Sequence, residues 1–153
     1  MEVKYINPFL TAVKNILESY SIEGIKRGNI SKKDNMNVDL DITAVVGLIG
    51  GIRGNVAYSL SQETAKGIVS AMMMGAPVEE MDSLARSAIG ELSNMITGTA
   101  SGILAQDGAM VDITPPSIIF GKEMYFIISS VETISVDMDT PYGKIEINIG
   151  LEI

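Results

Sequence analysis

The last ten residues of the chain alternate strictly between polar and apolar side chains. The apolar members of this segment are Ile145, Ile147, Ile149, Leu151 and Ile153. Successive side chains of a strand point to opposite faces, so the pattern predicts a strand with one face buried and one face in water. A sheet made of such strands is covered by helices on one face.

Other segments upstream also read as strands or as turns between strands. The predicted strands are 38–49, 55–60, 110–114, 117–120, 123–131, 133–138 and 144–153. The glycine-rich segment 50–54 predicts a hairpin turn; a phosphate-binding loop is the alternative, but the P-loop spacing and its Lys-Ser/Thr pair are missing. The polar segment 21–37 predicts a loop, with at most a short strand, in which Lys32 and Lys33 are solvated.

Three segments carry the periodicity of amphipathic helices. The first covers 5–20, and the second covers about 62–74 with Ser61 as its N-cap and Gly75 as its C-cap. Asp82 can cap a third helix of about 22 residues that ends before Gly108. Helices alternating with long strand-rich regions predict an α+β fold of two layers.

Length and composition favour one globular domain over residues 1–153. The chain is 46% hydrophobic and 20% charged, which is enough apolar surface for a real core. No apolar run approaches the roughly 20 residues of a membrane span, and the amino terminus lacks the regions of a signal peptide. We therefore expect a cytoplasmic protein that does not enter membranes.

The absence of two residue types excludes most familiar catalytic devices. The chain has no Cys and no His, so it offers no thiolate nucleophile, no imidazole base and no Cys- or His-ligated metal. Carboxylates, amides, hydroxyls, Lys and Arg remain, which suit positioning of water or hydrogen bonding to another protein's active site. A net charge of −8 disfavours nucleic acid as a partner.

The third predicted helix carries one carboxylate and one amide three residues apart, Glu91 and Asn94. Such a spacing makes two side chains neighbours on a helix surface, so both can touch one small target. Helical periodicity places an apolar stripe on one side, and Glu91 and Asn94 opposite it among small residues. The members predicted for this small-residue surface are Ser83, Ser87, Gly90, Thr97, Gly98 and Ser101. An ordinary solvated helix face is the alternative explanation of the pair.

Two pairs of aspartates are the other candidate ligands. Asp39 and Asp41, like Asp137 and Asp139, lie two residues apart on predicted strands and so share a face. Carboxylate oxygens could hold Mg²⁺ or Ca²⁺ there. A solvated strand face is the simpler explanation, so we assign no metal-binding residue and no cofactor of the chain's own.

Two motifs stand out along the chain: residues 87–98 read SAIGELSNMITG, and residues 111–117 read VDITPPS. Both motifs resemble the CheX branch of the CheC/CheX/FliY family of response-regulator phosphatases. The segments 47–54 (GLIGGIRG) and 61–65 (SQETA) are similar to that branch in order and spacing, so the resemblance covers nearly the whole chain. It implies a mainly antiparallel sheet with long helices packed on one face, and an internal pseudo-duplication.

The resemblance also implies an activity and a partner. Members of the family accelerate hydrolysis of the aspartyl phosphate of a CheY-like response regulator, whose own bound Mg²⁺ forms part of the reactive centre. Carried over to this chain, Glu91 would engage the regulator's active-site Lys and Asn94 would orient the attacking water. Phosphoryl transfer asks chiefly for positioning, and an amide can hold a water as both donor and acceptor.

The same resemblance limits the number of sites and suggests an assembly. The CheC members carry a second Glu-x-x-Asn on the first helix, but here residues 8–17 read PFLTAVKNIL, with Ala12 three residues before Asn15. One site per chain follows, together with a homodimer joined through its sheets. The regular carboxyl-terminal strand would offer the edge that such a dimer covers.

Two other classes of function remain open. One is a non-catalytic module, like the middle domain of flagellar switch proteins, that binds a regulator or a ring subunit without hydrolysing anything. The presence of both Glu91 and Asn94 favours the phosphatase. The other is a small-molecule or metal-binding α+β domain that uses the strand aspartates.

Overall fold

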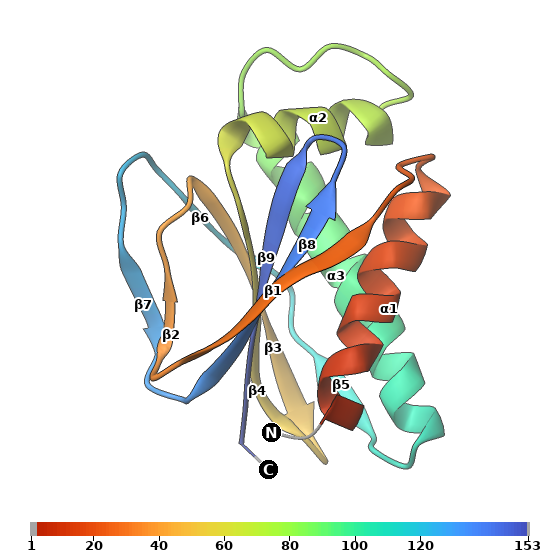
Figure 1. Ribbon diagram of the computed structural model, residues 1–153, viewed down its shortest axis with the longest axis vertical. Coiled ribbons are helices and arrows are strands. Elements are labelled where there is room, and N and C mark those ends of the chain that lie inside the picture. The colour runs from red at the N-terminus through yellow and green to blue at the C-terminus, as the bar shows by residue number, and fades with distance from the viewer. Residues whose placement is uncertain (1–2, 153) are drawn as a thin grey trace.

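A computed structural model describes residues 3–152 as three helices packed against a twisted, antiparallel sheet (Figure 1). In chain order the elements are α1 (Val3–Ser19), β1 (Lys26–Lys33), β2 (Met36–Val38), β3 (Ile42–Gly50), β4 (Arg53–Leu60), α2 (Gln62–Met72), α3 (Ser83–Gln106), β5 (Val111–Ile113), β6 (Ser117–Phe120), β7 (Phe126–Ser129), β8 (Thr133–Thr140) and β9 (Gly143–Glu152). The α+β, two-layer prediction is confirmed. No helix within residues 3–152 is long and apolar enough to cross a bilayer.

The sheet has seven strands in the order β1-β8-β9-β4-β3-β5, and β6 also pairs with β3. The predicted hairpin at 50–54 joins β3 to β4, which pair from Ile42 with Leu60 to Leu48 with Gly54. A glycine is required at position 54, where φ is +150° and an added Cβ would collide with the backbone of β9 at Gly150. The segment is therefore a tight turn inside the sheet and not a phosphate-binding loop.

Side-chain caps define the starts of α2 and α3. The Ser61 hydroxyl accepts a hydrogen bond from the Thr64 amide, and Asp82 Oδ1 accepts one from the Ala85 amide at 2.9 Å. Both caps satisfy backbone donors that would otherwise have no partner in the first turn. Both caps match the sequence prediction, although α2 ends at Met72, two residues before the predicted end.

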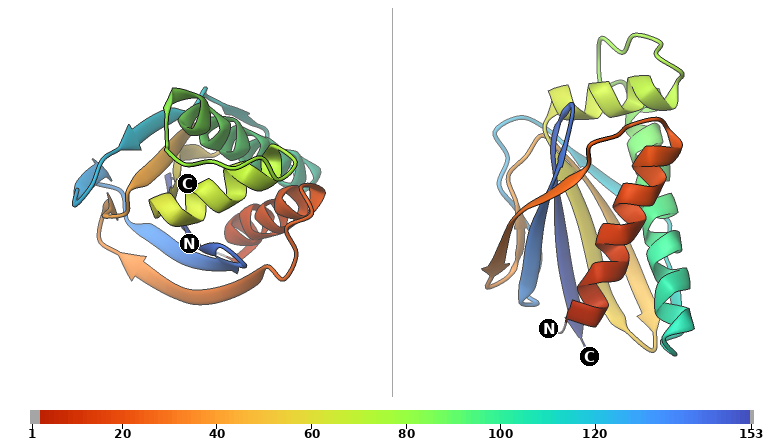
Figure 2. Two further views of the ribbon diagram at one scale, coloured as in Figure 1. Left: turned by 90° about the horizontal axis from the view of Figure 1, so that it is seen from above. Right: turned by 45° about the vertical axis from the view of Figure 1, so that its right-hand side comes forward.

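The helices cover one face of the sheet, with α1 and α3 side by side along the strands and α2 across one end (Figures 1 and 2). Ile145, Ile147 and Ile149 of β9 are fully buried beneath them, as the alternation predicted. The strand itself lies between β4 and β8, so it is central and the expectation that it forms a free edge is wrong.

The opposite face of the sheet is partly covered by a ribbon made of β2 and β7, which pair with each other. Met36 of β2 is fully buried, and its methyl group lies 3.0 Å from where a Cβ of Gly150 would stand. Asn148, predicted to face water, is fully buried on this side. Sequence alternation identified only the face under the helices, because the β9 residues of the second face are polar and the ribbon that covers them comes from segments distant in the sequence.

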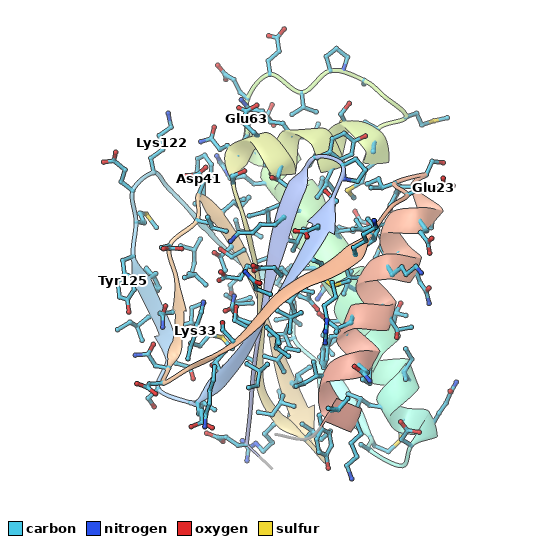
Figure 3. All side chains as sticks on the ribbon, viewed as in Figure 1. Glu23, Lys33, Asp41, Glu63, Lys122 and Tyr125 are labelled. Atoms are coloured by element: carbon cyan, nitrogen blue, oxygen red, sulfur yellow. The ribbon has the colours of Figure 1, made fainter. Side chains whose placement is uncertain are left out.

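The segment predicted as a loop at 21–37 contains the eight-residue edge strand β1, which pairs with β8. Its lysines differ sharply in environment. Lys32 is 62% exposed and pairs with Glu132, as a solvated lysine would, whereas Lys33 is 19% exposed. The Lys33 ammonium donates to Glu146 Oε1, to Asn148 Oδ1 and to the Asn37 carbonyl, each at 2.8 Å (Figure 3). Lys33 thereby ties β1 and the ribbon to the centre of the sheet.

We predict that Lys33→Ala lowers the free energy of unfolding by roughly 2–3 kcal/mol, because it leaves the three oxygen acceptors of a charged, half-buried donor without their hydrogen bonds. Lys32→Ala is the matched control, and its exposed pair should contribute less than about 1 kcal/mol. Urea denaturation of both variants measures the difference. Equal losses would contradict a special role for Lys33.

Candidate functional site

The candidate site lies on α3 where the helix runs beside β5 and β6. These two short strands pair with the same strand, β3, at its two ends: β5 with residues 48–50 and β6 with residues 42–45. Between them stand Thr114, Pro115 and Pro116. Because proline has no amide hydrogen to donate, the two prolines interrupt what would otherwise be one continuous edge strand.

The helix α3 and this interrupted strand run antiparallel, so residues later in α3 contact residues earlier in the strand. A Cβ added to Gly90 would lie 3.3 Å from Pro116 Cγ, Asn94 Nδ2 donates to the Thr114 carbonyl at 3.1 Å, and the Ser101 hydroxyl donates to the Val111 carbonyl at 2.9 Å. Gly90 is buried, so the cost of a helical glycine is offset by close packing. Asn94 lies in the middle of this series of contacts.

The amide of Asn94 is held in one orientation. A carbonyl can only accept a hydrogen bond, so the group facing Thr114 must be the Nδ2 amide; this leaves Oδ1 as the acceptor for a ligand, beside the second Nδ2 hydrogen. Within residues 3–152 no donor is bonded to Oδ1. Sequence reasoning placed Asn94 on an open helix face, whereas the residue is half-buried with one side of its amide anchored.

Glu91 is exposed, one turn before Asn94 on α3. In the part of the chain that the structure describes, its carboxylate has neither a hydrogen-bond donor nor a cationic partner. An exposed carboxylate of this kind is available to a cation on another molecule. The two side chains therefore differ: one amide is fixed from behind and one carboxylate is free.

The surface around the pair is narrower than the sequence predicted. Ser83, Ser87 and Gly98 are exposed as expected, but Gly90 and Thr97 are buried, and Ser101 is half-buried. The difference arises because α3 contacts α1 and α2 as well as β3, β5 and β6, so its buried arc is wider than the apolar stripe. Small polar residues fill the part of that arc where the backbones approach.

A buried series of hydrogen bonds attaches α3 to the sheet beneath it. The Thr97 hydroxyl donates its only hydrogen to the Ser93 carbonyl at 2.7 Å, so the Tyr58 hydroxyl, 2.8 Å away, must be the donor to Thr97. Tyr58 belongs to β4, and burial raises the pKa of its phenol well above the ordinary value. These hydrogen bonds link the centre of the sheet to the turn of α3 that carries Asn94.

One residue of each aspartate pair has a partner elsewhere in the chain. Asp39 and Asp41 lie in the connection between β2 and β3, not on a strand, and Asp41 Oδ2 accepts a hydrogen bond from the Gln62 amide at the start of α2 (Figure 3). Asp137 lies 3.8 Å from the Lys144 ammonium. Among residues 3–152 no group of three or more acidic side chains is placed to hold a metal ion. Asp39 and Asp41 therefore do not share a strand face as predicted, and Asp41 instead bonds the first turn of α2.

The sequence and fold place the chain among known proteins. Residues 42–138 match the family described as chemotaxis phosphatase CheX. The chain belongs to this CheX family. A CheY-P phosphatase CheX from Thermotoga maritima is 38% identical over 125 residues, which cover 81% of this chain and 80% of the relative. The resemblance inferred from the motifs is thereby confirmed, and the matched range contains Glu91, Asn94 and Thr114.

Solved structures of similar fold agree with membership of the CheX family. A CheC-like superfamily protein from Shewanella superposes with a TM-score of 0.89 at 28% identity and covers all of both chains. A chain from the CheX–CheY–BeF3–Mg²⁺ complex of Borrelia burgdorferi gives a TM-score of 0.83 at 28% identity, and covers 99% of this chain and 100% of that one.

Sequence reasoning missed Thr114 as part of the site. The residue is 20 positions from Asn94, and nothing in the helical pattern of α3 points to it. The available signal was the Thr-Pro-Pro sequence itself, since two successive prolines in a strand-rich region mark a break in backbone pairing.

We predict that Tyr58→Phe lowers the free energy of unfolding by about 1 kcal/mol, because the buried Thr97 oxygen loses its donor.

The raised pKa of Tyr58 gives the folded protein more bound protons than the unfolded chain above pH about 10, so the contribution of this phenol to stability falls as pH rises beyond that point. Phenolate absorbance of the two proteins should therefore differ only once circular dichroism shows unfolding. A difference while the protein is still folded would contradict the buried donor.

Proposed function

We propose that this chain accelerates hydrolysis of the aspartyl phosphate of a CheY-like response regulator. The observation that carries the proposal is that two side chains of different kinds lie one turn apart on α3. Glu91 has an exposed carboxylate, and Asn94 has an amide whose Nδ2 is already bonded to the Thr114 carbonyl. Membership of the CheX family supports it, as does the likeness to a chain from a complex of CheX with CheY. The Mg²⁺ for the reaction belongs to the partner.

In this reaction the protein positions the attacking water. Asn94 Oδ1 accepts a hydrogen bond from water, which leaves an oxygen lone pair directed at phosphorus. The water oxygen bonds to phosphorus as the bond from phosphorus to the aspartyl oxygen breaks. Inorganic phosphate leaves with the two protons of the water, and the regulator recovers its carboxylate. Holding a nucleophile in line lowers the barrier mainly by restricting its motion, and requires no base of shifted pKa.

Glu91 has a different role. Its free carboxylate binds the lysine of the regulator's active site, which fixes α3 over the phosphoryl group. An ion pair formed across an interface and screened from water adds to binding and to orientation. This role suits the exposure of Glu91 and its lack of partners among the described residues.

The chain is also proposed to act as a homodimer, and the ribbon offers the surface for it. The strand β7 has β2 as its neighbour on one side, and three consecutive side chains next to and on it are exposed: Tyr125 at 64%, Phe126 at 44% and Ile127 at 53% (Figure 3). Adjacent exposed apolar residues on a strand are uncommon in monomers and typically bind another chain.

The function is tested by phosphate release from a phosphorylated CheY-like regulator with Mg²⁺, using wild-type protein and two variants. Asn94→Ala should lower turnover at saturating regulator on the order of 10²- to 10³-fold, about 3–4 kcal/mol of barrier, with nearly unchanged binding. Glu91→Ala should weaken both binding and turnover. The protein alone should not hydrolyse small phosphate esters.

Matched controls separate these effects from instability. Asn15→Ala on α1 and Glu63→Ala on α2 remove exposed residues of the same types and should leave turnover unchanged. Asn94→Ala loses one hydrogen bond to Thr114, so its melting temperature should fall only slightly. Wild-type protein that binds regulators without accelerating phosphate loss would favour the scaffold function instead.

We predict that the protein has twice the 16.3 kDa chain mass at micromolar concentration and that Ile127→Lys makes it monomeric. A charge on β7 would have to be buried without a partner in the dimer. Ile30→Lys on β1 is the matched control, since Ile30 is 51% exposed on a strand already rich in lysine. Light scattering decides, and a monomeric wild-type protein would contradict the dimer.

A further inference from the structure

The hydroxyl of Thr114 occupies a place in the sheet that a backbone carbonyl normally holds. Thr114 stands opposite Gly47 of β3, and its amide donates to the Gly47 carbonyl at 3.0 Å. In a regular antiparallel pair of this kind the Gly47 amide would donate in return to the Thr114 carbonyl. Here it donates instead to Thr114 Oγ1, at 2.8 Å.

Because the hydroxyl accepts the hydrogen bond of the Gly47 amide, the Thr114 carbonyl is available to another donor. That donor is Nδ2 of Asn94, at 3.1 Å. The Thr114 hydroxyl has its own acceptor in the Pro115 carbonyl at 3.0 Å, so every polar group of Thr114 is paired. The proline that follows cannot donate to β3, which keeps the chain from returning to regular pairing at the next residue.

We infer that Thr114 is a positioning residue for the proposed reaction: its hydroxyl bonds the Gly47 amide so that its carbonyl can hold the Asn94 amide with Oδ1 directed at the attacking water. This inference rests on the proposed function of Asn94 and adds a residue outside α3 to it. Without the hydroxyl, the Gly47 amide would draw the Thr114 carbonyl into regular pairing with β3, which would turn that carbonyl away from Asn94 Nδ2.

Gly47 belongs to the same arrangement. A Cβ on this residue would lie 3.0 Å from Thr114 Cγ2 and 3.2 Å from Thr114 Oγ1, closer than ordinary contact. Gly47→Ala should therefore push the Thr114 side chain out of place while leaving its hydroxyl present. Among residues 3–152 no hydrogen bond joins Gly47 to Asn94, so an effect of Gly47→Ala on Asn94 would pass through Thr114.

The test compares Thr114→Val, Thr114→Ser and Gly47→Ala in two measurements. The first is turnover of phosphorylated regulator: Thr114→Val and Gly47→Ala should lower kcat by about tenfold or more with little change in KM, since they misplace a nucleophile and not a binding group. Thr114→Ser, which keeps the hydroxyl, should stay near wild type. The second is the Asn94 side-chain NH2 signal in nuclear magnetic resonance spectra, assigned by its loss in Asn94→Ala.

The NH2 signal reports the anchor directly, in the free protein. It should shift toward the position of an unbonded amide in Thr114→Val and Gly47→Ala, and stay in place in Thr114→Ser. Thr140→Val is the matched control: its hydroxyl also donates to a carbonyl, that of Gly143 at 2.7 Å, and accepts from an amide, that of Tyr142 at 3.1 Å, in the turn between β8 and β9. It should lower stability comparably without moving kcat or the Asn94 signal.

The outcomes separate this inference from the proposed function. Lower kcat together with a shifted signal, restored in Thr114→Ser, supports the positioning role. An unchanged signal in Thr114→Val and Gly47→Ala overturns it, even if turnover falls. A wild-type protein that accelerates no regulator overturns the proposed function and with it the catalytic meaning of the anchor, while the NH2 signal still decides whether Thr114 holds Asn94.

Discussion

The close approach of α3 to the interrupted edge of the sheet determines the rest of the site. Gly90 permits this approach, because any larger residue would press against Pro116 and Ile118. Once the helix lies at this distance, Asn94 reaches the Thr114 carbonyl one turn later, and Ser101 reaches Val111 two turns after that. The glycine costs about 1 kcal/mol in an isolated helix. In the folded protein that cost is offset by packing and by hydrogen bonds along three turns of α3.

This geometry would account for the proposed chemistry in a chain without His or Cys. A carboxylate base of raised pKa would need burial or a neighbour of like charge, and both cost stability. An amide bound on one side to a carbonyl needs neither, since it is neutral and its remaining oxygen is already oriented. Glu91 stays in water until a partner supplies a cation, so the free protein carries no buried charge at this site. The residues therefore suit a reaction whose charged groups come with the other protein.

Local sequence rules predicted the parts of the fold that local interactions control. Ser61 and Asp82 were identified as caps because an N-cap depends on the next three residues alone. The strand β1 was missed because its residues are polar and mostly exposed, and pairing with β8 holds them in place. The burial of Thr97 was missed because a single apolar stripe cannot report a helix enclosed on several sides. The contact of Asn94 with Thr114 joins residues 20 apart, so no periodicity could reveal it.

The two surfaces proposed to bind protein partners lie on opposite faces of the sheet (Figure 2). The helices, with Glu91 and Asn94 on α3, cover one face, while the ribbon of β2 and β7 covers part of the other. Lys33 and Asn148 hold the strands together on the ribbon side, and Tyr58 and Thr97 fix α3 on the helix side. Each surface is thus supported by its own buried polar contacts to the central strands β4 and β9. A dimer formed through β7 would leave both copies of α3 open, so each chain could bind its own regulator without releasing the other chain.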